Sequence, residues 1–131
     1  MKKRETVDTR IASIYRDENE IIVITMKDCG KVDEFDVLDV NLVIRNLSKN
    51  KAAYKLLDAK ANWNMDAKAK ERAKLENSVT KTSARAVVVS SIVKSTLLKF
   101  LQSFSKFDYP QKTFTDFYEA YDWLLALKNK K

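Results

Sequence analysis

The stretch Ala84–Lys128 constrains the fold most, because a strand pattern, a helix pattern, a second strand pattern and a second helix pattern follow one another in it. Ala86–Ser90 is a short β-branched run without alternation, which is typical of a strand buried on both faces. Apolar residues then recur at helical spacing until Tyr109-Pro110, where the proline ends the helix. Lys112–Thr115 predicts a second strand, and Asp116 is expected to cap the last helix. This order predicts two parallel strands joined by a helical crossover.

The residues before this stretch predict an N-terminal hairpin. Arg10–Arg16 and Glu20–Met26 have strand patterns, and the turn sequence Asp17-Glu18-Asn19 lies between them. A loop is expected at Lys27–Lys31, in which Gly30 is the residue best suited to a positive φ angle.

The middle of the chain completes the pattern. Asp33 is expected to cap a helix that runs to about Leu47, and two apolar rows predict a broad buried face for it. These rows are Phe35, Leu38 and Leu42, and Val40, Ile44 and Leu47. Ala53–Ala59 predicts the next strand, Ala61–Met65 a loop, and Asn64 or Asp66 the cap of a charged helix. The full order is β-β-α-β-α-β-α-β-α, an α/β fold with helices packed on an open mixed β-sheet, and residues 1–131 are expected to form a single domain.

The composition excludes several classes of catalytic and metal site. The chain has no histidine, one cysteine (Cys29) and one glycine (Gly30). Ser–His and Cys–His nucleophilic sites are therefore excluded, as are histidine-ligated metals, a zinc cluster within one chain and glycine-rich phosphate loops. We expect no catalytic residue, no metal and no cofactor, and we expect Cys29 to be an unreactive thiol.

The same features indicate a cytoplasmic protein. A single cysteine cannot form an internal disulfide. No apolar run approaches the roughly 20 residues that span a bilayer, and no signal peptide follows the basic start of the chain.

The net charge of +7 is unevenly distributed. Asp17–Asp39 contains eight acidic residues and two lysines, whereas Lys49–Arg85 contains ten basic and four acidic residues. Solvated helix faces are the simpler explanation of the basic segment, so we expect no specific binding of nucleic acid.

This order of elements resembles the STAS domain, the fold of bacterial anti-sigma-factor antagonists. It resembles more closely the small bacterial proteins described as STAS-like or SEC14-like (SpoIIAA-like). The segments that match are Ala84–Ser91, Phe104–Pro110, Thr113–Asp116, Glu119-Ala120 with Trp123-Leu124, and Met65–Lys70. The resemblance covers essentially the whole chain and implies the fold more strongly than an activity.

One departure from that family is informative. Anti-sigma-factor antagonists carry a phosphorylatable Ser or Thr between the third strand and the second helix. Here the turn is Asn62–Met65, and no serine or threonine occurs between Ser48 and Ser78. A phosphoryl switch, which adds about two negative charges, therefore cannot operate at this helix start.

Ligands bind beyond the carboxyl ends of parallel strands in open α/β sheets, so the residues there are the candidate binding residues. They are Asn62, Trp63 and Asn64 after one strand, Ser90 and Ser91 after the next, and Asp116 after the last. Trp63 could anchor a partner or fold back as a lid over the core. Ser90 and Ser91 could bind an anion through backbone N–H groups or simply cap a helix.

These observations favour a non-enzymatic STAS-like interaction or regulatory module with an unidentified protein partner. A carrier or sensor of a small apolar or lipid-like molecule, as the SEC14-like relatives imply, is the alternative. An apolar pocket between the sheet and the helices would favour the carrier, and a filled core with an exposed Trp63 would favour the partner module. A homodimer could form through Phe107, Tyr109 and Tyr118 if they are exposed.

Overall fold

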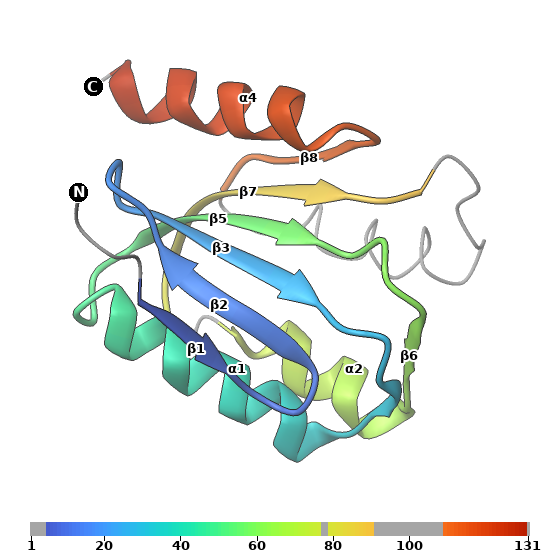
Figure 1. Ribbon diagram of the computed structural model, residues 1–131. Helices are drawn as coiled ribbons and strands as arrows, with labels where there is room; N and C mark the ends of the chain where they lie inside the picture. Colours follow the sequence, from blue (N-terminus) through green and yellow to red (C-terminus); the bar gives the residue numbers. More distant parts are fainter. Residues whose placement is uncertain (1–4, 77–78, 91–108, 131) are drawn as a thin grey trace.

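The computed structural model describes residues 5–76, 79–90 and 109–130, in which a mixed β-sheet lies between helices on its two faces (Figure 1). The six strands of this sheet lie in the order β1-β2-β3-β5-β7-β8. They are β1 (Thr6–Asp8), β2 (Ala12–Arg16), β3 (Ile21–Met26), β5 (Ala53–Asp58), β7 (Thr82–Val88) and β8 (Gln111–Phe114). Strands β1, β2 and β3 are antiparallel, whereas β3, β5, β7 and β8 run parallel to one another. The predicted open mixed sheet with an N-terminal hairpin is confirmed.

Three helices cover this sheet in the described part of the chain. Helices α1 (Glu34–Leu47) and α2 (Ala67–Lys74) lie on one face, and α4 (Phe117–Asn129) lies on the other (Figure 1). Each begins at an aspartate whose carboxylate accepts a hydrogen bond from a backbone N–H three residues later, which satisfies a donor that the helix itself leaves unpaired. These N-caps are Asp33, Asp66 and Asp116.

The helix predicted after Ser90 falls outside the described residues, and so do Ser91 and Phe107. The parallel pairing expected on either side of it is confirmed, because Ala86 of β7 lies opposite Lys112 of β8.

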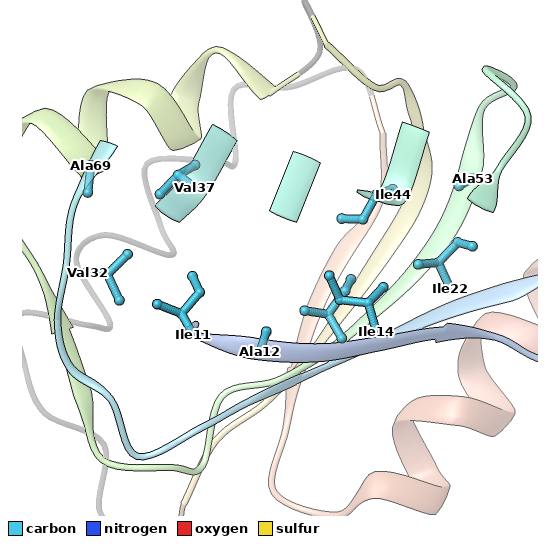
Figure 2. Close-up of a cluster of buried hydrophobic side chains, with 10 residues drawn as sticks. Ile11, Ala12, Ile14, Ile22, Val32, Val37, Ile44, Ala53 and Ala69 are labelled. Carbon is cyan, nitrogen blue, oxygen red and sulfur yellow. The ribbon is translucent and has the colours of Figure 1, made fainter. Parts of the chain in front are cut away.

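Of the two predicted rows of helix α1, Val40, Ile44 and Leu47 pack against the core, and only Ile44 of them is fully buried. Val37, Asn41 and Ile44 face the sheet and are buried, and Figure 2 shows Val37 and Ile44 on the side from which Ile11 and Ile14 approach. Phe35 and Leu42 lie on the opposite side of the helix and are 68% and 46% exposed. The predicted broad buried face was therefore wrong for this row. A helix that packs on one sheet can bury a single stripe, and residues about 180° away stay in solvent.

A second, two-stranded sheet was not predicted. Strand β4 (Gly30–Val32) pairs in parallel with β6 (Trp63–Met65), where the sequence indicated two loops. Gly30 has the positive φ angle expected of it, 72°. The pairing holds the segment after β5 against the start of α1, so the position of Trp63 is set by backbone hydrogen bonds and not by a free loop.

Candidate functional site

The predicted binding residues follow strands that run parallel, so they lie toward one edge of the sheet. Asn62 and Asn64 are exposed, and the Asn62 backbone N–H donates to the Asp28 carboxylate at 2.6 Å. Ser90 is exposed at the end of β7. Asp116 is exposed and caps α4. The hydrogen bonds of Asn62 and Asp116 run to Asp28 and to α4 itself, not to each other.

Trp63 is half-buried and packs against the core. Its indole N–H donates to the Ala59 carbonyl oxygen at 3.1 Å, and its ring contacts the cluster that contains Val87 and Val89. The tryptophan therefore has the geometry of a lid with one edge in solvent.

A cavity of about 110 Å³ lies beneath Trp63, between the sheet and helices α1 and α2. Its walls are mostly aliphatic. The lining residues are Ile11, Ile24, Met26, Val32, Val37, Val40, Asn41, Ile44, Lys55, Leu57, Ala59, Trp63, Met65, Ala73, Glu76 and Arg85. Lys55 and Leu57 lie on one face of β5 and Ala59 directly follows the strand, so the lining extends for about 13 Å from Lys55 to Ala59.

The end of the cavity away from Trp63 contains buried charge. The Lys55 side chain is 1% exposed, and its ammonium donates to Glu76 Oε2 at 2.5 Å. Arg85 donates to the other oxygen of the same carboxylate, and Thr82 donates to Oε2 at 3.3 Å. Lys55 and Arg85 lie opposite each other in the pairing of β5 with β7, so the sheet register brings the two cations together. We call Lys55, Glu76 and Arg85 the charge cluster.

The environment of the charge cluster shifts the pKa of Lys55. Burial in an apolar pocket disfavours the ammonium form, and the Arg85 guanidinium repels it, so the pKa falls to about 6. The Glu76 carboxylate acts in the opposite direction.

The pKa of the Cys29 thiol is shifted upward, whereas that of Lys55 is shifted downward. Burial raises the pKa of its thiol, so the thiolate that a nucleophile requires is disfavoured. This direction agrees with the sequence-based interpretation of Cys29 as unreactive.

Sequence reasoning missed the charge cluster. Lys55 and Arg85 stand among the ten basic residues that were interpreted as solvated surface, but both are buried. One signal was present: Lys55 lies between Ala53 and Leu57 on the same face of a strand. A lysine at the apolar position of an alternating pattern indicates a buried amine.

The described residues were also searched for metal ligands and for membrane-spanning helices. Within residues 5–76, 79–90 and 109–130, no three cysteine or acidic side chains gather as ligands for a metal ion. Over the same residues, no helix is both long enough and apolar enough to cross a bilayer.

Comparison with solved structures supports the fold described above. The chain is similar to an uncharacterised protein of the DUF3478 family from Shewanella loihica PV-4, whose crystal structure has a SpoIIAA-like fold. The TM-score is 0.64 at 14% sequence identity, and the match covers 95% of this chain and 97% of the other. The protein is therefore an α/β protein with the SpoIIAA-like fold.

The sequence also matches a family model. Residues 15–128 match the domain of unknown function DUF7793, so the chain belongs to that family. A search of curated proteins gave no match.

Proposed function

We propose that this protein is a non-enzymatic regulatory module that binds a small, largely apolar molecule between its sheet and helices α1 and α2. The observation that carries the proposal is the cavity of about 110 Å³. An empty apolar cavity of similar size, about 150 Å³, is sufficient to hold a molecule such as benzene. Pockets for drug-sized ligands begin near 300 Å³, so the volume favours a small molecule over a long acyl chain.

The residues that line the pocket support a role in binding and not in catalysis. Among the described residues that line it there is no serine, threonine or cysteine, and the chain contains no histidine. The Lys55 amine is engaged by Glu76. A ligand in this cavity would contact α1, α2 and Trp63 at once, so its binding would change how firmly these elements are held against the sheet.

Thermal unfolding with and without toluene tests the proposal. Toluene should raise the melting temperature of the wild-type protein, because a ligand that binds only the folded state stabilises it. Ala73→Leu places a larger side chain in the cavity, and this variant should melt higher without toluene and respond less to it. Ala126→Leu, the same change at an exposed position of α4, is the matched control and should respond like the wild type. No response of the wild type, or equal responses of Ala73→Leu and Ala126→Leu, contradicts the proposal.

A protein partner remains the second candidate, and the exposed face of α1 favours it. Phe35 and Leu42 contribute apolar surface there, and Tyr118 on α4 is 75% exposed. If a second copy covers the α1 face, sedimentation at rising concentration should show a dimer that Phe35→Ser weakens and Tyr118→Ser does not. A monomer at all concentrations contradicts this dimer.

A further inference from the structure

Two groups that line the pocket have N–H donors without acceptors. Asn41 is 5% exposed, lines the cavity from α1, and its side-chain N–H2 group has no hydrogen-bond partner among the residues that the structure describes. A buried donor in this state costs about 1–3 kcal/mol, so an acceptor that reached it would gain that free energy.

The Lys55 amine also has more N–H donors than acceptors around it. A neutral amine has two N–H donors, and the hydrogen bond that Lys55 makes goes to Glu76. The carboxylate oxygens of Glu76 also accept from Arg85 and Thr82. Two basic groups therefore share one carboxylate within the described lining of the cavity, and the other lining residues are mostly aliphatic.

We propose that the ligand is a small monocarboxylate with a compact hydrocarbon body, whose carboxylate accepts hydrogen bonds from Lys55 and Asn41 while the hydrocarbon lies toward Trp63. The inference rests on the proposed function and specifies the ligand class of the same pocket. A carboxylate supplies an acceptor for both groups, and it balances the charge that Lys55 gains when the amine takes up a proton. The aliphatic walls formed by Ile24, Val37 and Leu57 match a branched or cyclic body.

Protonation gives the proposal an independent readout. In the empty pocket, burial and Arg85 favour the neutral amine of Lys55. An anion beside Lys55 favours the ammonium form, so binding at about pH 8 should take up a proton. Of the described neighbours, Glu76, which follows α2, accepts a hydrogen bond from this amine, Arg85 lies opposite Lys55 on β7, and the neutral Asn41 of α1 lines the same cavity. Titration calorimetry in two buffers of different ionisation enthalpy measures this uptake.

The test compares isovalerate with its neutral isostere isovaleramide. Wild-type protein should bind isovalerate at least about tenfold more tightly, which corresponds to one charge-assisted hydrogen bond. Lys55→Met should abolish both the preference and the proton uptake while retaining isovaleramide. Lys68→Met, at an exposed position of α2, is the matched control and should behave like the wild type.

The outcomes separate this inference from the proposed function. Binding of toluene or isovaleramide with no preference for isovalerate overturns the inference and leaves the proposed function intact. A preference that persists in Lys55→Met also overturns it. Failure of all three molecules to bind overturns the proposed function and the inference with it.

Discussion

Replacing Glu76 with glutamine should destabilise the protein strongly, because its carboxylate accepts hydrogen bonds from two buried basic groups, Lys55 and Arg85. The Lys55 side chain is 1% exposed and that of Arg85 8%, so neither can turn to water when the carboxylate is lost. Removing one partner of a buried ion pair costs about 3–5 kcal/mol. The Lys55 amine, with a pKa of about 6, is already largely neutral at neutral pH, whereas the Arg85 guanidinium remains charged and loses its counter-charge. We therefore expect a loss of about 3–5 kcal/mol in the free energy of unfolding at neutral pH.

Lys55→Met is the informative counterpart. Methionine fills a similar volume, removes a buried amine and leaves the contact between Glu76 and Arg85 in place. Replacing buried charge by a well-packed apolar side chain is often neutral or stabilising by about 1–4 kcal/mol. Lys55→Met should therefore not destabilise the protein. Glu76→Gln should also cost less in the Lys55→Met background, because one buried donor to the carboxylate is absent.

Urea unfolding of the wild type, the two single variants and the double variant measures all four free energies. The slope against urea should be unchanged, which shows that the same surface is exposed in each case. Two results would refute the reasoning. One is a cost below about 1 kcal/mol for Glu76→Gln, which is the range of an exposed ion pair. The other is a loss above about 2 kcal/mol for Lys55→Met, which would mean that the amine is a required part of the core.

Four further predictions use the same structure. The folded-state pKa of Lys55, about 6, lies below its ordinary value of 10.5. Between these two pH values the unfolded chain binds a proton that the folded chain lacks, so the free energy of unfolding should rise with pH more steeply in the wild type than in Lys55→Met. Urea titrations across this pH range measure both slopes, and equal slopes would contradict the prediction. Trp63→Ala should cost about 3 kcal/mol or more in urea melts, and a negligible cost would mean that the indole is not a lid. Leu124→Ala should cost about 2–5 kcal/mol and Leu42→Ala almost nothing, since the first is fully buried and the second is on the exposed face of α1; a similar cost for both would place α1 wrongly. A kinase for anti-sigma-factor antagonists should leave residues 62–65 unmodified, and a phosphate found there by peptide mass spectrometry would refute the argument from the missing hydroxyl.

Local signals in the sequence determined most of the secondary structure. The hairpin of β2 and β3 follows from two apolar runs on either side of a turn sequence. Asp33 and Asp116 marked helix starts because an aspartate N-cap acts on backbone groups only three residues away. The parallel sheet followed from the alternation of strands and helices. Each of these inferences depends on residues close together in the chain.

Contacts between distant segments decided the rest. Strand β6 pairs with β4, which lies 33 residues earlier, and neither segment has a strand pattern of its own. The choice between the two apolar rows of α1 was made by the sheet that covers one of them. The charge cluster takes its residues from β5, β7 and the end of α2, and each looks like an ordinary surface charge in the sequence. The sequence by itself determined the elements and their order, whereas the tertiary structure decided which side chains are removed from water, because burial depends on residues that are far apart in the chain.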